Sequence, residues 1–411
     1  MTGEQIEKNE RIKRFLSVLL GFADVSAAFF FDKRMNAQNT TALALSYQYG
    51  LIPRGLVGTL LYVLKEFLGI SLYSYRRVMC FTALVTICYY GILFAFYAIC
   101  LKKTKEEHIK LSETVIAFVS IFMFTEFLTW NNFERLDEYL MMITLLCLIL
   151  LIWERGEWLL IPLCCIAGLV HVGFVFTNVG VILVLLLWKI FQKEGRERKK
   201  YIVLFAGCFL CVSVLFLYFE IFRQPLGMSE YEEIVALARS ISEDGASISD
   251  SLLDSEILGL DVFEDEWVWH TKNYVETPIF LILFSPYLYI GIRFFKQLIG
   301  NAGNRKEKWK YIIVLIGAGT IVPELILKVD YGRWMFCIVA YYCLTIVALI
   351  ALGDSYLTEQ LKNTGRWLKE KCSFYWVLLI YPIIFVPFRD VYISDVTTRI
   401  MDFVAPILHI W

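Results

Sequence analysis

The sequence predicts an all-α, polytopic α-helical membrane protein with about 11 transmembrane helices. Three observations carry this prediction. Hydrophobic residues make up 58% of the 411 residues and charged residues only 19%, whereas soluble domains keep a charged fraction near about one quarter. The mean hydropathy is +0.60, more apolar surface than one soluble core can bury. The apolar residues also lie in stretches long enough to cross about 30 Å of hydrocarbon. We therefore treat residues 1–411 as a single transmembrane domain.

Nine of the predicted spans are continuous apolar stretches. They cover 15–31, 78–101, 111–130, 139–153, 201–222, 277–295, 311–329, 334–352 and 374–388. The first follows a basic stretch and resembles a cleavable signal. Its hydrophobicity continues through Phe31, so we expect it to remain as an uncleaved span.

The apolar stretch 158–190 is anomalous, because its 33 residues are too many for one crossing and few for two. Lys and Arg cluster in the alternate connections 102–110, 189–200, 293–310 and 362–371. The positive-inside rule makes these connections and the N-terminus cytoplasmic. Two spans already separate the first two connections, so 158–190 must return to its own side. The sequence predicts a short broken helix pair there, interrupted near 171–180, and an extracytoplasmic C-terminus.

Two predicted external loops flank this bundle. Residues 32–77 form the first, with an amphipathic or re-entrant helix whose apolar residues recur at helical spacing (Leu56, Leu60, Leu64, Phe67 and Leu68). Residues 223–276 form the second, an acidic loop with thirteen acidic and three basic side chains and hence a charge of −10. Within it, 228–243 has the apolar spacing of a helix.

Composition excludes several classes of function. The net charge of −1 leaves no basic field that would recruit nucleic acid. No cytoplasmic connection exceeds about twenty residues, which disfavours an ATP-driven pump or an enzyme with its own nucleotide-binding domain. The eleven cysteines lie in or beside apolar runs, as small hydrophobic residues do. We predict no metal site and no cofactor.

The segment 49–58 reads Tyr-Gly-Leu-Ile-Pro-Arg-Gly-Leu-Val-Gly and leads into the amphipathic helix. Free N–H groups at a helix start, with Arg54 beside them, form an anion site for which phosphate is the natural ligand. The alternative is an interfacial helix whose arginine extends to the membrane surface. Asp32 lies earlier in the same loop.

Two further charged clusters lie next to predicted spans on the external side. Residues 131–138 place three carboxylates and Arg135 in one turn, where crowding can turn a carboxylate such as Asp137 into a general base, or Arg135 can neutralise it. Asp330 and Arg333 lie three residues apart, so the carboxylate can aim the guanidinium at phosphate or sugar hydroxyls. The competing interpretation is a helix cap beside an interfacial tryptophan.

His171 is the histidine that lies inside an apolar run, at the predicted break of the short helix pair. A histidine at such a break is a candidate for ligand binding or proton transfer, because its ring exchanges protons near neutral pH. The alternative is a purely structural histidine.

With its many spans, external arginines and acidic external loop, the chain resembles the bacterial polytopic families that assemble cell-surface polysaccharide, namely the O-antigen and capsule polymerases and exopolysaccharide membrane proteins. It is also similar to type C glycosyltransferases, which place an acidic residue in the first external loop, where Asp32 lies. The resemblance implies a glycosyltransferase or polymerase that uses polyprenyl-(pyro)phosphate-linked glycan at the extracytoplasmic face of the bacterial cytoplasmic (inner) membrane. The implied partners are a lipid-linked donor and acceptor, membrane lipid and other polysaccharide-assembly membrane proteins, with no nucleic acid.

This hypothesis gives each candidate residue a role. The expected substrate-binding residues are Arg54, Arg135, Arg333, Asp330 and Asp32. The expected catalytic base for the acceptor hydroxyl is Asp137 or His171, and the acidic loop would act as a lid. One alternative is a lipid-linked glycan flippase or small-solute transporter, in which broken helices and buried charges form a pathway. Another is a non-catalytic membrane assembly or immunity protein, in which the external charges are dispensable.

Overall fold

The computed structural model describes residues 37–103, 136–243, 248–259, 281–282, 285, 288–327 and 331–371. Within these ranges the regular elements are all helical, which confirms the predicted fold class for this part of the chain. The bundle consists of α4 (Tyr75–Lys103), α6 (Asp137–Trp153), α7 (Leu160–Val170), α8 (Phe174–Thr177), α9 (Val179–Gln192), α10 (Gly195–Leu217), α14 (Arg305–Ile316), α15 (Val322–Leu327) and α16 (Tyr331–Ala351). Short 3₁₀ or π turns extend it at η3 (Glu157–Leu159), η4 (Tyr218–Phe222) and η6 (Gly317–Ile321).

Four helical stretches of the described residues are long and apolar enough to cross a membrane. They are Tyr75–Cys100, Gly195–Phe222, Arg305–Ile326 and Arg333–Ala351. Two shorter apolar helices accompany them, Glu157–Val170 and Val179–Gln192. The expected spans 15–31, 111–130 and 374–388 lie outside the described residues, so the total of 11 stays a prediction.

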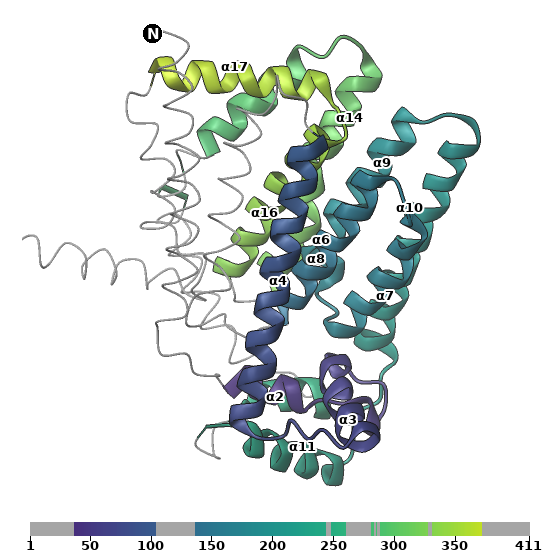
Figure 1. Cartoon of the computed structure of the whole chain (residues 1–411), viewed down its shortest axis with the longest axis vertical. Helices are drawn as coiled ribbons and strands as arrows, with labels where there is room; N and C mark the ends of the chain where they lie inside the picture. The colour runs from purple at the N-terminus through teal and green to yellow at the C-terminus, as the bar shows by residue number, and fades with distance from the viewer. Residues whose placement is uncertain are drawn as a thin grey trace, which may run out of the picture.

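One end of the bundle gathers basic side chains. At the top of Figure 1, α4 and α9 end, α10 and α14 begin, and α17 (Ser355–Lys371) lies across the bundle axis. The basic residues here include Lys102, Lys103, Lys193, Arg196, Arg198, Lys199, Arg305, Lys306 and Lys308. We call this the basic end. Basic connections that the sequence assigns to one side of the membrane thus lie at one end of the bundle.

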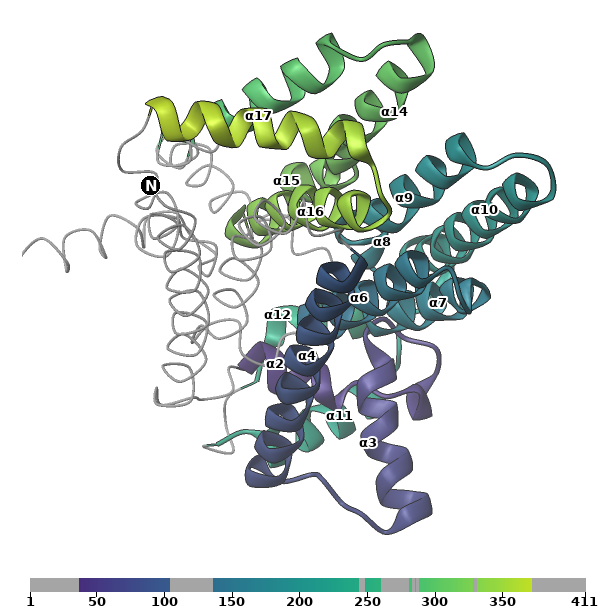
Figure 2. The ribbon, with the colours of Figure 1, turned by 45° about the horizontal axis from the view of Figure 1, so that its top comes forward.

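A layer of short helices covers the opposite end (Figure 1). It contains α2 (Ala37–Ala44), η1 (Tyr47–Tyr49), α3 (Gly55–Leu68), α11 (Met228–Ile241), α12 (Asp250–Leu253) and η5 (Asp254–Leu258). We call residues 37–70, 226–243 and 248–259 the cap layer. Its two segments are joined where the backbone N–H of Ser249 donates to Oγ1 of Thr41 at 2.9 Å. α3 is foreshortened in Figure 1, where the bundle helices run lengthwise, and appears lengthwise only in the turned view of Figure 2, so it lies across the bundle axis.

The stretch 158–190 forms two short helices with a break between them, as the sequence predicts. α7 ends at Val170, the chain turns, and α8 and α9 run back. Both ends of this hairpin lie at the basic end. Glu157 accepts a hydrogen bond from the Tyr201 hydroxyl near the start of α10 (2.5 Å), and Lys189, near the end of α9, pairs with Glu154 at 2.6 Å. The hairpin therefore enters and leaves the bundle on the same side.

A glycine lets the turn η6 approach its neighbours closely. A Cβ at Gly317 would lie 2.1 Å from the Tyr341 hydroxyl and 2.6 Å from a methyl carbon of Val184. The same Tyr341 hydroxyl donates to the carbonyl of Val314 at 2.8 Å, just before α14 gives way to the 3₁₀ turn. The absence of a side chain at Gly317 thus allows α9, η6 and α16 to pack as one core.

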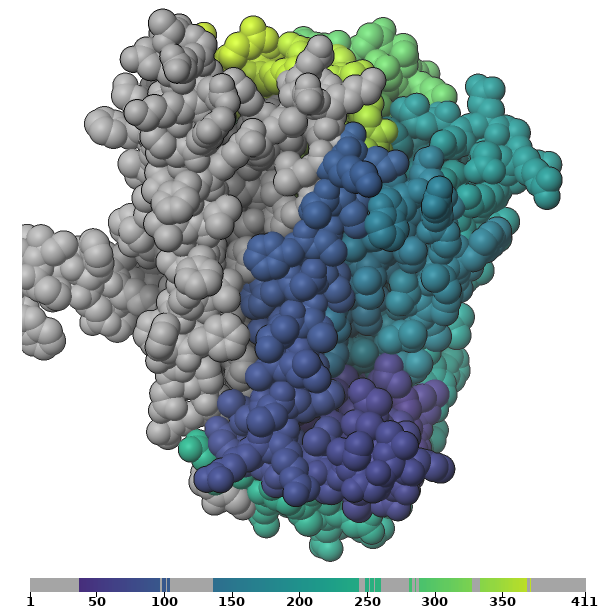
Figure 3. Space-filling view, in the orientation of Figure 1, coloured from purple at the N-terminus to yellow at the C-terminus, as the bar shows by residue number. Residues whose placement is uncertain are grey.

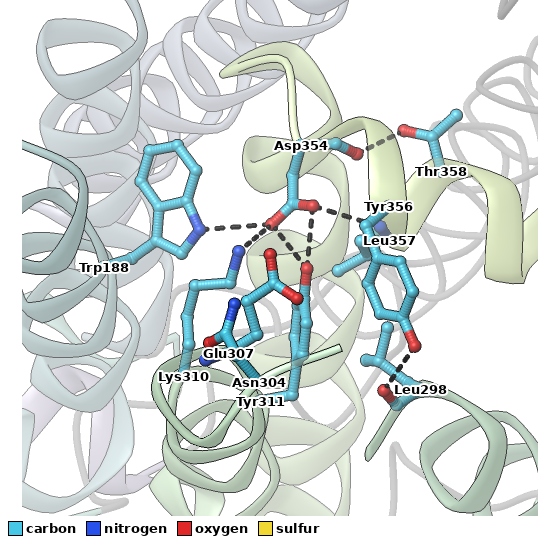
Figure 4. A network of polar contacts seen from close by, with 10 residues as sticks. All are labelled: Trp188, Leu298, Asn304, Glu307, Lys310, Tyr311, Asp354, Tyr356, Leu357 and Thr358. Atoms are coloured by element: carbon cyan, nitrogen blue, oxygen red, sulfur yellow. Dashed lines mark hydrogen bonds and ion pairs between the residues drawn. The ribbon is translucent and has the colours of Figure 1, made fainter. Parts of the chain in front are cut away.

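A buried network around Asp354 closes the basic end (Figure 4). Asp354 is 6% exposed, and its Oδ1 accepts from the backbone N–H of Leu357, which caps the start of α17 (3.0 Å). Its Oδ2 accepts from Nε1 of Trp188 (3.2 Å) and Nζ of Lys310 (3.0 Å). The Tyr311 hydroxyl donates to Oδ1 at 2.8 Å. One carboxylate therefore connects α9, α14 and α17.

Candidate functional site

The candidate site lies inside the bundle, where α6 and α16 begin and the hairpin breaks, close to the cap layer (Figure 1). We call its charged and titratable residues the helix-end cluster: Asp137, Glu138, His171, Glu324 and Arg333. The break is joined to α6 by Asn178, whose Nδ2 contacts the sulfur of Met141 at 3.9 Å. Thr86 of α4 lies beside Glu138 of this cluster. Thr86 comes eleven residues after the start of α4, which is about 16 Å along the helix axis.

Arg333 and Asp137 form an ion pair across 196 residues of sequence. Nη2 of Arg333 donates to Oδ2 and Oδ1 of Asp137 at 2.7 and 2.9 Å. Asp137 is the first residue of α6, where a carboxylate interacts favourably with the helix dipole. Arg333 is 9% exposed, and its guanidinium carbon lies 4.7 Å from the centre of the Trp334 ring. The pair fixes a buried guanidinium between two helix starts.

Glu138 is the most enclosed acidic residue of the cluster, with 1% of its surface exposed. No described residue hydrogen-bonds to either of its carboxylate oxygens. Thr86 of α4 lies beside it, but the Thr86 hydroxyl donates to the carbonyl of Thr82 at 3.1 Å. The sequence places Glu138 in the acidic turn without singling it out. Its burial depends on how α6 packs against α4, which the local sequence does not reveal.

His171 is the C-cap residue of α7, and its ring lies against the backbone of the break. Nδ1 accepts a hydrogen bond from the backbone N–H of Gly173 at 2.9 Å. A nitrogen that accepts carries no proton, so the neutral ring carries its proton on Nε2. A Cβ at Gly173 would lie 3.0 Å from this ring and 3.5 Å from Oε1 of Glu324, so the two side chains border the same small space. In this state His171 offers a hydrogen-bond donor, whereas the sequence hypothesis assigns it the role of a base.

Arg54 lies in the cap layer, just before α3. Its backbone adopts the left-handed conformation (φ 61°, ψ 6°), which costs a non-glycine residue about 1 kcal/mol or more. Its Nε lies 3.2 Å from Oε1 of Glu256, and both side chains are less than one fifth exposed. The arginine of the predicted anion site therefore forms an ion pair with a carboxylate of the chain's own acidic segment.

The start of α3 is seated tightly and is tied to the helix break. A Cβ at Gly58 would lie 1.9 Å from the carbonyl oxygen of Leu45, so α3 packs directly on the backbone that precedes it. The Tyr47 hydroxyl donates to the carbonyl of Leu169 at 3.0 Å. Leu169 is two residues before His171, so the cap layer and the hairpin break are in direct contact.

The other face of α3 is apolar and exposed. Phe67 is 78% exposed and Leu68 63%, and Leu60 and Val63 extend the stripe. In Figure 3 this helix lies on the surface beside the lower half of α4. A contiguous apolar stripe on a helix that lies across the bundle is typical of a helix at a lipid interface.

Three predicted site residues, Asp32, Arg135 and Asp330, lie outside the described residues. In the described ranges, no group of three or more His, Cys, Asp or Glu side chains could hold a metal ion. Of the predicted residues that are described, the structure brings Asp137 and Arg333 into contact, places His171 at the neighbouring break and pairs Arg54 with Glu256 in the cap layer. No protein-family model, curated protein or solved structure matches this chain.

Proposed function

We propose that the chain is a membrane glycosyltransferase or polymerase of surface-polysaccharide biosynthesis that uses polyprenyl-(pyro)phosphate-linked glycan. The observation that carries the proposal is the helix-end cluster, in which a buried guanidinium held by a carboxylate lies between two helix starts and an imidazole donor lies at the neighbouring helix break. Charged groups inside a membrane are costly, and they tend to mark substrate or ion pathways.

The proposed topology has about 11 spans in the bacterial cytoplasmic (inner) membrane. The gathering of basic residues at one end of the bundle supports a cytoplasmic basic end, with the acidic cap layer outside. The N-terminus is then cytoplasmic and the C-terminus extracytoplasmic. A donor that reaches the outer face must already be attached to its lipid carrier, because the chain has no long cytoplasmic connection for a nucleotide-binding domain.

The ion pair suggests how the reaction starts. At rest, Arg333 is occupied by Asp137. A pyrophosphate carries more negative charge than a carboxylate, so it can replace Asp137 at the guanidinium. Asp137 is then free to accept the proton of the acceptor hydroxyl while that oxygen attacks the anomeric carbon. The bond to the phosphate breaks, and Arg333 stabilises the electron pair that stays on the leaving group.

The remaining residues have supporting roles in this proposal. His171 donates from Nε2 to an oxygen of the substrate, because its Nδ1 is occupied by Gly173. Arg54 exchanges Glu256 for a second phosphate oxygen in the same way as Arg333 exchanges Asp137. Arg135, Asp330 and Asp32 complete the substrate-binding set. The exposed stripe of α3 gives the polyprenyl chain an apolar surface beside this site.

Single substitutions test the proposal in a strain that lacks the chromosomal gene. The variants are Arg54→Ala, Arg135→Ala, Asp137→Asn, His171→Ala and Arg333→Ala, each expressed at the level of the unaltered protein. We expect surface glycan to fall about tenfold or more with Asp137→Asn and Arg333→Ala, the loss that corresponds to about 1.4 kcal/mol of transition-state stabilisation. Arg366→Ala is the matched control, because Arg366 pairs with Glu359 in an exposed position at the basic end. Normal glycan in all five variants would exclude the enzyme and favour an assembly or immunity protein.

A lipid-linked glycan flippase or small-solute transporter is the second candidate. The broken hairpin and the enclosed Glu138 favour it, because discontinuous helices and buried acids are common in transport pathways. Purified protein in liposomes distinguishes the two functions when it is given lipid-linked glycan extracted from the deletion strain. Lengthening of the glycan indicates the transferase, and movement of an unchanged glycan between leaflets indicates the flippase.

A further inference from the structure

Glu138 is a buried acid that the proposed reaction does not use. It is 1% exposed, and among the described residues neither of its oxygens has a hydrogen-bond partner. The adjacent Asp137 differs in both respects, because it is partly exposed and receives two hydrogen bonds from Arg333. Two consecutive carboxyl groups therefore have opposite environments.

The elements around Glu138 supply little charge to balance it. α4 carries no charged residue between Arg77 and Lys102, and Thr86, which lies beside Glu138, is uncharged. α7 carries no charged residue, but the titratable His171 follows it with Glu324 nearby, and α9 carries no charged residue before Lys189 at the basic end. Arg333 of α16 is bonded to Asp137. Glu134 and Arg135, which precede the described part of α6, lie outside the described residues.

An isolated carboxylate in apolar surroundings is far less stable than the neutral acid, so a buried carboxyl without a partner takes up a proton. When water or a polar molecule reaches such a group, the charged form is solvated and the proton is released. Inside a membrane, carboxyl groups of this kind exchange protons as part of pumps and transporters.

We propose that Glu138 is a proton-binding site inside the bundle. It holds a proton in the arrangement described here and releases it when water or a polar ligand enters between α4 and α6. This site does not depend on the proposed transferase activity, since a flippase with the same fold would contain it too.

A hydrophobic carbodiimide, dicyclohexylcarbodiimide, reads the protonation state directly. It reacts with protonated carboxyl groups in apolar surroundings: the acid proton moves to one carbodiimide nitrogen, the carboxyl oxygen bonds to the central carbon, and the acyl group then shifts to nitrogen as a stable N-acylurea. The purified full chain in detergent is treated from about pH 5 to about pH 9, a range that covers perturbed carboxyl groups. Peptide mass spectrometry then locates the modified residue.

We expect Glu138 to be modified several-fold more than the adjacent Asp137, with the yield falling as the pH rises. After unfolding in sodium dodecyl sulfate, the two residues should react equally, which shows that the reagent and the peptide mapping can detect both. Equal or lower modification of Glu138 in the folded chain would overturn the proposal, because it would mean that the carboxyl is ionised or has a partner.

Infrared spectroscopy provides a second measurement that needs no reagent access. The carbonyl band of a protonated carboxylic acid should be present in the unaltered chain and in Asp137→Asn, and absent in Glu138→Gln. A spectrum in which Glu138→Gln keeps the full band would contradict the assignment. Neither measurement uses glycan synthesis, so failure here and failure of the transferase proposal can be told apart.

Discussion

Two buried polar clusters in the described part of the bundle, the Asp354 network and the helix-end cluster, differ in how completely their charges are satisfied. At the basic end, Asp354 receives hydrogen bonds from Trp188, Lys310, Tyr311 and a helix start, and it joins three helices (Figure 4). In the helix-end cluster, one ion pair lies beside Glu138, which has no hydrogen-bond partner among the described residues.

This difference distinguishes a cluster that stabilises the fold from one that is available for chemistry. A buried charge network strengthens a structure when every donor and acceptor is paired, and a partly satisfied network is costly. The Asp354 network meets the first condition. The helix-end cluster does not, and it occupies the interior of the bundle, where water is scarce. Its residues are therefore better explained by what they bind or transfer than by stability.

The largest effect should come from the basic end. Asp354→Ala leaves the ammonium group of Lys310 buried without its carboxylate, and breaking a buried pair in this way costs about 3–5 kcal/mol. We expect a large fall in the thermal unfolding temperature of the detergent-solubilised protein. Glu359→Gln removes an exposed ion pair of the same end and should change stability by less than about 1 kcal/mol. Equal effects of the two substitutions would mean that the Asp354 network is not a stabilising unit.

A smaller loss of stability, with a loss of function, should follow Arg333→Ala. Asp137 is partly exposed, so water can replace some of the missing hydrogen bonds, and we expect a cost of about 1.5–3 kcal/mol. Surface glycan should be lost even at a temperature where the variant is fully folded. If Arg333→Ala keeps its surface glycan but loses as much stability as Asp354→Ala, the ion pair has a structural role like that of the Asp354 network.

The sequence alone predicts some of these features and not others. The broken hairpin could be predicted, because 33 apolar residues between two basic connections have to return to one side. The partner of Arg333 could not be predicted from the sequence. Asp137 contacts Arg333 from 196 residues away in the sequence because α6 packs against α16, whereas the predicted neighbour Asp330 lies outside the described residues.

Other features were missed because their signals are weak or nonlocal. Gly353-Asp354-Ser355 before an amphipathic stretch is a helix start signal, and it could have identified α17 and its capping aspartate. Nothing in the local sequence separates Glu138 from Asp137, since their difference arises from contacts with α4 and α16. The left-handed backbone conformation of Arg54 could not be predicted either, because residues other than glycine rarely adopt it.

Among substitutions of the buried acids, Glu138→Gln should change stability least. This prediction tests the difference between the helix-end cluster and the Asp354 network. The substitution exchanges a protonated carboxyl for an amide of nearly the same size and takes no hydrogen bond from a neighbouring described residue, so we expect a change within about 1 kcal/mol. Thermal unfolding of the variant, beside Asp354→Ala, measures this. Destabilisation by Glu138→Gln as large as that of Asp354→Ala would show that Glu138 has a structural partner and would remove the distinction between the clusters.

The smallest expected effect is a pH dependence of stability that arises from Glu154, at the exposed edge of the basic end. Burial opposes ionisation of Glu154, but hydrogen bonds and charges from Lys189 and Lys193 outweigh it and lower the Glu154 pKa from 4.5 to about 2. A carboxyl with a lowered pKa contributes stability that is fully present above about 4.5 and is lost as the pH falls towards 2. The part of the stability that depends on the titration of Glu154 should be small, less than about 1 kcal/mol, because this side chain is 44% exposed. Unfolding temperatures of the unaltered chain and of Glu154→Gln should therefore differ most at neutral pH and converge as the solution is acidified, whereas a constant difference would show that the pair's charge does not stabilise the hairpin.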